Sequence, residues 1–201
     1  MSSLANGFIL PPLSAPYGAF EPVLDRLTLE THHRYIYGAA AERLYGETRL
    51  RPLLSSETEM PFTAAYSKNE DGRIYDCHRF YFNSILPPSY SGLRMPKGAL
   101  LAEIQRGYGS AEGFFSAVKS AVKHIDRVGF LWALKGRWGI FLRFLPDHMT
   151  PSLSEHPLFC IDLWEHAYFL RYRERRDAYL YGFFRIINWA EIEKRYEKIK
   201  R

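Results

Sequence analysis

The sequence predicts an α+β protein of two parts. An N-terminal helical hairpin domain, residues 1–90, is followed by a C-terminal domain, residues 91–201, of helices around a three-stranded antiparallel sheet. Apolar residues recur at helical intervals through the first part, whereas the second part also contains three short apolar runs typical of strands. The change in composition over residues 88–92 marks the expected boundary between the two domains.

The first helix is expected over residues 22–50, after a proline-rich and extended opening. Apolar residues in this segment show helical spacing, and Pro22 suits a first helical turn. His32 and His33 both lie inside the segment. Because adjacent side chains on a helix diverge by about 100°, only one of these histidines can face a given centre.

A second helix is expected over residues 73–85, where it stops before Pro87. Residues 51–69 are polar and show no continuous helical or strand pattern. Residues 69–72, Asn-Glu-Asp-Gly, have the composition of a turn. The second helix carries His78 among aromatic residues. A histidine among aromatic residues is either a packed core residue or a metal ligand, and the sequence of this helix alone does not distinguish the two.

The second domain is expected to contain helices over residues 97–106 and 110–124, strands over 128–134 and 138–144, a third strand ending at Asp162, and helices from Leu163 and Asn188. Ser110 and Asn188 are expected to cap their helices, because their side-chain oxygens can accept from free backbone N–H groups. The glycine-containing turn over residues 135–137 predicts that the first two strands form a hairpin.

The composition is that of a globular protein with an aromatic-lined interior. Of 201 residues, 47% are hydrophobic and 16% aromatic, and no apolar run approaches the length of about 20 residues that spans a bilayer. The opening residues lack secretory or transit features, so we expect a cytoplasmic protein, or a mitochondrial one if the chain is a processed form. Cys77 and Cys160 show no CxxC pattern and are expected to be reduced.

The net charge of +5 favours anionic partners, which include a small anionic substrate, nucleic acid or an acidic membrane. The basic residues are densest over residues 171–176 and 194–201, where glutamates are interspersed at helical spacing. This pattern is more typical of solvated helix faces than of a nucleic-acid stripe. We therefore expect no membrane partner, and no nucleic-acid partner for a catalytic form of the protein.

The apolar run over residues 157–161 predicts a buried strand that ends at Asp162, and His166 follows four residues later. A carboxylate oxygen and an imidazole nitrogen together suit a divalent or trivalent first-row metal. The spacing alone also fits an Asp-His pair on a helix surface or a buried structural histidine. The surrounding sequence therefore has to decide between these interpretations.

Residues 162–168, Asp-Leu-Trp-Glu-His-Ala-Tyr, match the Asp-x-Trp-Glu-His-Ala-Tyr signature of the iron/manganese superoxide dismutases. Residues 17–22, 96–98 and 187–189 match other landmarks of that family in the same order. The chain resembles this family over nearly its whole length. The resemblance implies an antioxidant enzyme that converts superoxide to oxygen and hydrogen peroxide by cycling one iron or manganese ion between its trivalent and divalent states.

The resemblance also implies the metal ligands. Counting from the opening motif places His32, and not His33, on the first ligand position, and His78, Asp162 and His166 on the others. One Fe or Mn ion per subunit is implied, with a solvent molecule as a fifth ligand. The ligands alone do not distinguish the two metals, since both accept three imidazoles and a carboxylate.

The residues beside the metal depart from the family pattern. The family's glutamine that hydrogen-bonds the metal's solvent has two possible places, which are here Ile74 and the segment ending at His148. His148 is the candidate replacement, and the less favoured alternative is a loop histidine on the surface. Trp164 is retained in the ligand motif, and Glu165 stands where the family's glutamate contacts a ligand histidine of the partner subunit, which implies a homodimer.

The substrate channel is expected to be less polar than in the family. The family's tyrosine eight residues after the first ligand is Ala40 here, and its histidine four residues after that ligand is Ile36. Phe169 replaces the tyrosine that reaches this histidine across the dimer. Losing both partners of one hydrogen bond leaves no buried polar group unpaired. Two family tryptophans near the metal appear as Phe82 and Phe130.

A second hypothesis is a dismutase-like structural protein, such as a ribosome-associated scaffold subunit, with little or no catalysis. The apolar channel and the high isoelectric point of about 9.2 favour it, since RNA contacts benefit from lysine and arginine. The complete ligand set opposes it.

Overall fold

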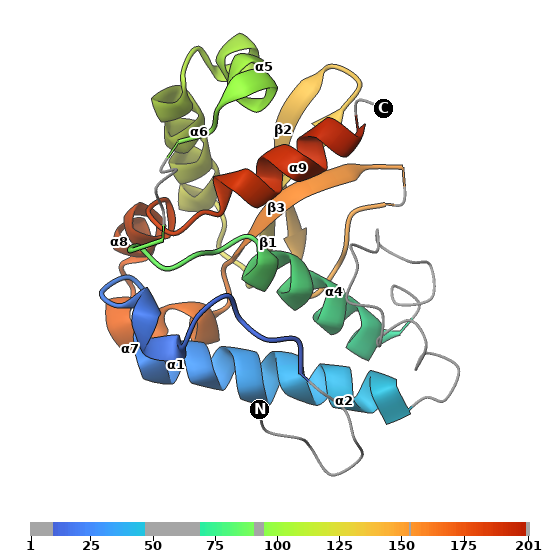
Figure 1. Ribbon diagram of the computed structural model, residues 1–201, viewed down its shortest axis with the longest axis vertical. Helices are drawn as coiled ribbons and strands as arrows, with labels where there is room; N and C mark the ends of the chain where they lie inside the picture. The colour runs from blue at the N-terminus through green and yellow to red at the C-terminus, as the bar shows by residue number, and fades with distance from the viewer. Residues whose placement is uncertain (1–9, 47–68, 91–94, 153, 200–201) are drawn as a thin grey trace.

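The structure of the chain, a computed structural model, describes residues 10–46, 69–90, 95–152 and 154–199. Figure 1 shows the first helical region along one end of the molecule, with helix α4 (Glu70–Asn83) between it and the sheet. Of the remaining helices, α7 (Phe169–Tyr172) lies beside the first helical region, and α9 (Trp189–Ile199) crosses the sheet in this view. This arrangement confirms the predicted fold class. The boundary expected at residue 90 stays a prediction, since residues 91–94 lie outside the described residues.

The first helical region begins later than predicted and is not a uniform α-helix. It consists of a 3₁₀ turn (Tyr17–Phe20), helix α1 (Arg26–Glu30), a π-helical segment (Thr31–Tyr37) and helix α2 (Gly38–Gly46). The start predicted at Pro22 is wrong, because the carboxylate of Asp25 accepts a hydrogen bond from the backbone N–H of Thr28 at 2.8 Å and caps α1. The end predicted at residue 50 lies outside the described residues.

The π-helical segment widens the helix where the two histidines lie. The N–H of Gly38 bonds the carbonyl of His33, five residues back, instead of the residue four back as in an α-helix. Because this backbone hydrogen bond spans five residues, the side chains that follow point in other directions than they would in an α-helix. His32, His33 and Tyr37 are all buried, and all three rings pack against Phe82.

Helix α4 (Glu70–Asn83) carries His78 and begins at the segment predicted to be a turn. That prediction is wrong, because the Asn69 side chain accepts from the N–H of Gly72 at 2.6 Å and starts the helix. The helix ends two residues before the predicted position, well before Pro87. Most of the polar segment over residues 51–69 lies outside the described residues.

The sheet has the predicted three antiparallel strands, in the order β2-β1-β3. The strands are β1 (Gly129–Gly136), β2 (Gly139–Pro146) and β3 (His156–Asp162). Gly136 pairs with Gly139, so the hairpin turn consists of two residues and lies one position later than predicted. Because Asp162 pairs with Phe130, the end of β3 lies beside the start of the central strand.

In the described part of the chain after residue 94, two α-helices precede the sheet and three follow it. They are α5 (Gly98–Tyr108), α6 (Ala111–Lys123), α7 (Phe169–Tyr172), α8 (Arg176–Phe183) and α9 (Trp189–Ile199). The caps predicted at Ser110 and Asn188 are confirmed, since their side chains accept from backbone N–H groups at 3.0 and 3.2 Å.

The helix predicted to start at Leu163 is wrong. The N–H of Leu163 bonds the carbonyl of Gly129 at 2.9 Å, and the next N–H, that of Trp164, bonds Asp162 Oδ1 at 2.8 Å. These bonds hold the chain extended after β3, and a short 3₁₀ helix (Glu165–Ala167) follows.

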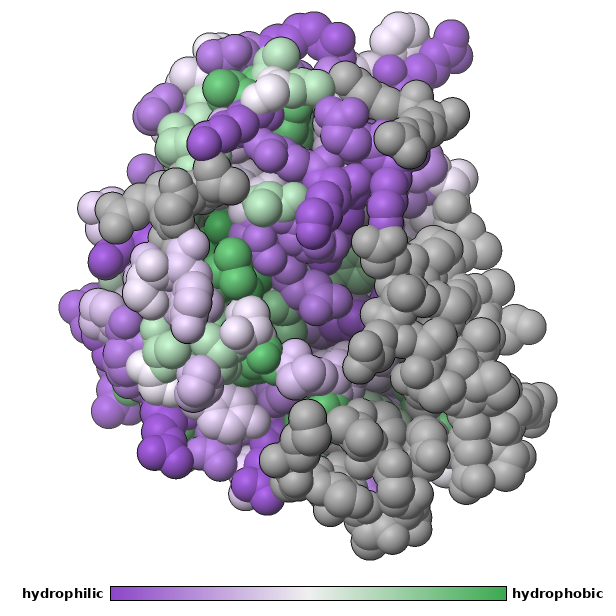
Figure 2. All heavy atoms as spheres, in the orientation of Figure 1, coloured by the Kyte–Doolittle hydropathy of each residue, from purple (hydrophilic) through white to green (hydrophobic). Residues whose placement is uncertain are grey.

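The aromatic interior expected from composition occupies both faces of the sheet. Phe80 of α4 packs against Trp132 of β1 at a ring-centroid distance of 5.7 Å. Phe159 of β3 packs against Phe114 and Trp189, at 6.2 and 6.1 Å. On the face in Figure 2, hydrophilic side chains dominate the coloured surface. In the described part of the chain, no helix has the length and apolar character needed to cross a membrane.

Candidate metal centre

Four elements converge to bring the predicted ligands together. His32 comes from the π-helical segment, His78 from the middle of α4, Asp162 from the end of β3, and His166 from the short 3₁₀ helix that follows. The first three side chains are fully or almost fully buried, whereas 20% of the His166 side chain is exposed. The four residues are far apart in sequence, so only the folded chain forms this cluster.

One carboxylate oxygen lies at the middle of the cluster. Asp162 Oδ2 is 3.2 Å from His32 Nε2, 3.3 Å from His166 Nε2 and 3.8 Å from His78 Nε2. One potential ligand atom from each of the four residues lies within 4.8 Å of all the others. The donors therefore form a compact group rather than a chain of pairs.

These donors fit one first-row metal ion. Nitrogen and oxygen ligands bind such an ion at about 2.1 Å, which places neighbouring ligand atoms about 3 to 3.6 Å apart. The Nε2 atoms of His32 and His78 are buried and have no hydrogen-bond partner within the described residues. A buried polar atom without a partner costs about 1–3 kcal/mol, and an ion between the four side chains would remove that cost.

The ring of His78 is oriented for metal binding by its other nitrogen. Its Nδ1 donates to the backbone carbonyl of Ile74 at 2.7 Å. A carbonyl only accepts, so the proton is on Nδ1 and the Nε2 lone pair faces the cluster. The second carboxylate oxygen of Asp162 accepts from the Trp164 N–H, which leaves Oδ2 for the cluster. Such outer contacts fix the direction of metal ligands.

Burial favours the neutral form of two of the predicted ligands, His32 and His78, which is the form that binds a metal. Burial lowers the pKa of His32 to about 4, although Asp162 opposes the shift. The pKa of His78 also falls well below 6.5, mainly through burial and then through the neighbouring His32. Burial alone would raise the pKa of Asp162, but His166 and His32 outweigh it and the pKa is lowered. The neutral imidazoles of His32 and His78 and the ionised carboxylate of Asp162 are available near neutral pH.

His33 takes no part in the cluster. Its Nε2 lies 2.9 Å from the carbonyl of Pro11 and its Nδ1 lies 3.0 Å from the hydroxyl of Tyr17. The carbonyl requires a proton on Nε2, so the Tyr17 hydroxyl donates to Nδ1. Both ring nitrogens are thus occupied by the protein. The structure places His32, and not His33, among the other three donors, as the sequence count predicts.

His148 is half-buried and lies beside the cluster. Its ring stacks on Trp164 at 4.8 Å with an angle of 22° and lies 5.6 Å from the His78 ring. Its Nε2 is buried and has no hydrogen-bond partner among the described residues. Trp164 in turn stacks on His166 at 5.8 Å. The indole therefore packs against both a predicted ligand and the candidate solvent partner.

The walls of the site are apolar and aromatic. The Phe82 ring lies 4.7 Å from His32, and the Phe130 ring lies 5.7 Å from His78. Ala40 is fully buried, whereas Ile36 is half-buried. Phe169, at the start of α7, is 41% exposed. The channel residues that depart from the family pattern thus lie at different depths, from Ala40 in the core to Phe169 on the surface.

Two neighbours of the centre were not predicted from sequence. Tyr37 is fully buried and stacks on His78 at 6.2 Å with an angle of 15°. It follows His32 by five residues, so only the π-helical spacing brings it there. Cys77 directs its thiol toward the backbone carbonyl of His148 at 3.7 Å. Its position next to His78 in the sequence indicated that it lies near the site. Its contact with the loop that carries His148 could not be predicted from the sequence.

The fold and the donors together define a class of protein: a helical region and an α/β part enclose a mononuclear site of three imidazoles and one carboxylate. The family model of the iron/manganese superoxide dismutases, C-terminal domain, matches residues 96–195. This segment contains the sheet, Asp162 and His166.

Curated relatives match the chain nearly end to end. The manganese superoxide dismutase of Bordetella pertussis is 32% identical over 205 residues, covering 94% of this chain and 94% of the relative. The Mn/Fe superoxide dismutase of Methylomonas sp. is 30% identical over 203 residues, covering 95% and 98%. The mitochondrial manganese superoxide dismutase of Aspergillus fumigatus is 27% identical over 202 residues, covering 96% and 94%. The chain belongs to the iron/manganese superoxide dismutase family.

Proposed function

We propose that this chain is an iron- or manganese-dependent superoxide dismutase that converts superoxide to oxygen and hydrogen peroxide. The observation that carries the proposal is the group of four donors, His32, His78, Asp162 and His166, within 4.8 Å of one another, of which the first three are buried. Relatives named as manganese or Mn/Fe superoxide dismutases support the same reaction and the same two metals.

A bound iron or manganese ion supplies one-electron exchange through its divalent and trivalent states. The protein contributes the ligand charge: one carboxylate, Asp162, stands against three neutral imidazoles. This set leaves the occupied site positive and therefore attractive to an anion such as superoxide. The aromatic walls at Phe82 and Phe130 exclude bulk water, which strengthens the attraction.

We assign to His148 the hydrogen bond to the solvent molecule of the site, in place of the family's glutamine. The buried Nε2 without a partner supports this role, since a neutral imidazole can donate one hydrogen bond and accept another. Stacking on Trp164 holds the ring in place. We expect His148→Ala to lower kcat while bound metal is retained, and His148→Gln to recover most of the loss.

Proton delivery is the step that the apolar channel alters. Ile36 and Ala40 offer no hydrogen-bonding group where the family has a histidine and a tyrosine. Protons would then reach the site by the His148 side rather than through the channel. If so, Ile36→His, at a half-buried channel position, would change kcat little, whereas His148→Ala would lower it strongly.

A two-fold homodimer is proposed from Glu165. This side chain is exposed, next to His166, and forms no ion pair within the described ranges. In the dimer it would accept from His166 of the partner subunit and orient that ligand. Light scattering tests the state: a dimer is expected for the native chain and weaker association for Glu165→Ala. A monomeric native chain would contradict the assignment.

The enzyme is tested by loading the purified chain separately with iron and with manganese, and measuring metal per subunit and superoxide removal. About one ion per subunit with activity in at least one form is the expected result. His78→Ala should lose both bound metal and activity. Stoichiometric metal without activity would contradict the catalytic proposal, and no bound metal would contradict the ligand assignment as well.

The alternative of a dismutase-like structural protein is not favoured, since a scaffold has no need of four converging donors. The expected compartment remains the cytoplasm, or the mitochondrion if the chain is a processed form. Fractionation of cells that produce the protein would test this expectation.

A further inference from the structure

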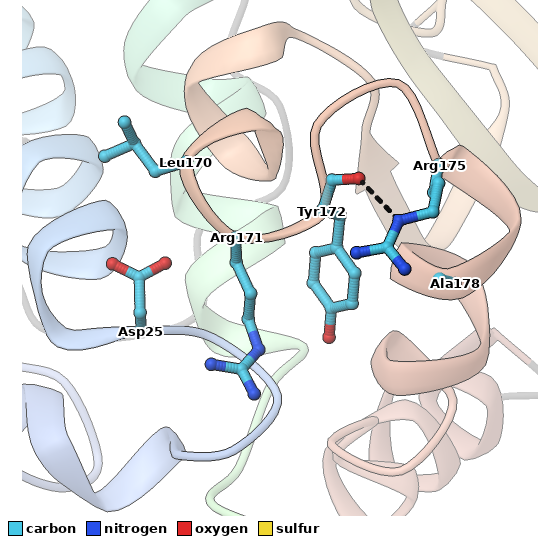
Figure 3. Close-up of a pocket in the computed structure, with 6 residues that line it drawn as sticks. All are labelled: Asp25, Leu170, Arg171, Tyr172, Arg175 and Ala178. Atoms are coloured by element: carbon cyan, nitrogen blue, oxygen red, sulfur yellow. Dashed lines mark hydrogen bonds between the residues drawn. The ribbon is translucent and has the colours of Figure 1, made fainter.

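Two adjoining hollows lie on the surface around α7 and α8, and none of the four predicted ligands lines them. Their volumes are about 490 and 590 Å³, and they share Arg171, Tyr172 and Ala178. The first is drawn in Figure 3, and the second reaches from the residues before α1 to Lys119 of α6 and Arg185 after α8. We call the two together the α7–α8 cleft. Volumes of this order suit a small ligand.

The cleft carries an excess of positive charge. Its basic lining residues are Lys119, Arg171, Arg175 and Arg185, and its acidic ones are Asp25 and Asp177. The Asp25 carboxylate is already engaged, because its two oxygens accept from the N–H and the hydroxyl of Thr28 at 2.8 and 2.5 Å.

The basic side chains of the cleft are largely available to a ligand. Only Arg171 has an ion pair, with Glu21 at 3.3 Å, while Lys119, Arg175 and Arg185 have none in the part of the chain that the structure describes. Lys119 and Arg185 are also exposed. The cleft therefore presents cationic groups to an incoming anion.

The floor of the cleft is fixed by the protein itself. The hydroxyl of Tyr172 donates to the carbonyl of Val23 at 2.7 Å, and Arg175 Nε donates to the Tyr172 carbonyl at 3.3 Å. A Cβ atom on Gly182 would lie 2.5 Å from the Tyr172 hydroxyl, so glycine makes room for this contact. Figure 3 shows Arg171 and Arg175 on either side of Tyr172. The shape therefore exists without a ligand.

The rim of the cleft offers an aromatic face. Tyr181 lines the same hollow as Lys119 and Arg185, and 70% of it is exposed. An exposed tyrosine next to cations matches a ligand that carries both an anionic group and a flat ring. Base stacking on an aromatic side chain contributes about 1–3 kcal/mol per base, and guanidinium groups match phosphate oxygens in geometry.

We propose that the α7–α8 cleft binds a nucleotide, with its phosphate at the arginines and its base against Tyr181. The same chemistry is present in a free nucleotide and in a single nucleic-acid strand. Because the four metal donors take no part, this proposal stands or falls separately from the proposed dismutase activity.

The test uses the full-length, metal-loaded chain and three probes: inorganic phosphate, AMP, and an oligothymidylate of eight nucleotides, with binding measured by calorimetry. We expect saturable AMP binding that is at least about 10-fold tighter than phosphate, which corresponds to 1.4 kcal/mol for the base. An oligonucleotide that binds at least 10-fold tighter than AMP would identify a strand as the source of the ligand. Similar affinities would identify a free nucleotide.

Arg185→Gln has a matched control in Arg137→Gln. Arg137 is exposed on the β1–β2 turn, outside the cleft, and also has no ion pair in the described chain. We expect Arg185→Gln to weaken AMP binding about 10-fold, Arg137→Gln to leave it unchanged, and Tyr181→Ala to weaken AMP without weakening phosphate. Absence of saturable nucleotide binding, AMP no tighter than phosphate, or equal losses in both arginine variants would overturn the proposal. Circular dichroism verifies that each variant is folded.

Discussion

His32 and His33 are adjacent in the chain and almost equally buried, at 1% and 4% exposure, yet the partners of their ring nitrogens differ. His33 has both ring nitrogens bonded by the protein, through Tyr17 and Pro11. His32 has a buried Nε2 without a partner, directed at three other donors. Burial and a lowered pKa are common to both residues, so neither identifies a ligand. The unsatisfied nitrogen facing further donors does.

The largest expected effect is a difference in bound metal between variants of the two histidines. Removing a residue that only hydrogen-bonds a metal ligand already lowers metal affinity or activity about 10- to 100-fold. His32→Ala should therefore lower superoxide removal by more than about 100-fold and lose the bound metal. His33→Gln, which keeps a donor and an acceptor, should retain about one ion per subunit. Metal analysis and activity assays check both. Metal loss in His33→Gln with metal retained in His32→Ala would reverse the assignment.

Metal removal should destabilise the region around His32. An ion present at 1,000 times its dissociation constant stabilises the folded state by about 4 kcal/mol, so chelation should lower Tm by roughly 10 °C for a chain of this size. Differential scanning calorimetry with and without the ion measures the change. In His32→Ala the chelator should have little effect, and an unchanged shift there would contradict the role of His32.

Acid should destabilise the region around His33. Burial lowers the pKa of His33 to about 4, below the value of about 6.5 for a free histidine. As the pH falls from 6.5 toward 4, the unfolded chain binds a proton at this residue and the folded chain does not, so folded stability falls. In metal-free protein this residue should account for a loss of about 2.5 kcal/mol between pH 7 and pH 4.5.

His33→Phe should remove that share of the pH dependence. Urea denaturation of the metal-free native chain and of the variant, at pH 7 and pH 4.5, measures the difference. If the two proteins lost the same free energy of unfolding between pH 7 and pH 4.5, His33 would not stay neutral in the folded state.

The smallest effect tests one hydrogen bond of His33. Tyr17→Phe removes the hydroxyl 3.0 Å from Nδ1 and should cost about 1 kcal/mol of folding free energy. Metal content should not change, because the ring faces away from the four donors. Chemical denaturation and metal analysis check the two statements. A loss of metal in this variant would mean that the two regions are coupled more closely than the contacts indicate.

The four clustered donors were predictable because the family resemblance assigned them: residues 162–168 match its signature, and counting from its opening motif selects His32. The fold class followed from periodicity, which is a local pattern of the sequence. The π-helical segment was not predictable, since its i to i+5 bonding leaves no separate periodicity over seven residues. The place of Tyr37 beside His78 depends on that segment and was missed with it.

Two errors in the predicted elements have one cause. Asn69 and Asp162 each use a side-chain oxygen to bind a nearby backbone N–H, at 2.6 and 2.8 Å. In the first case the bond starts a helix where a turn was expected, and in the second it prevents a helix. Asparagine and aspartate serve turns, caps and extended segments alike, so composition alone does not decide which one forms.

The most direct test of the account is anomalous diffraction from crystals of the metal-loaded chain, collected at the iron or manganese absorption edge. The account predicts one strong peak per subunit, within about 2.3 Å of His32 Nε2, His78 Nε2 and His166 Nε2 and of an Asp162 oxygen. A peak bound by His33 or lying elsewhere, or no peak in stoichiometrically loaded protein, would contradict it.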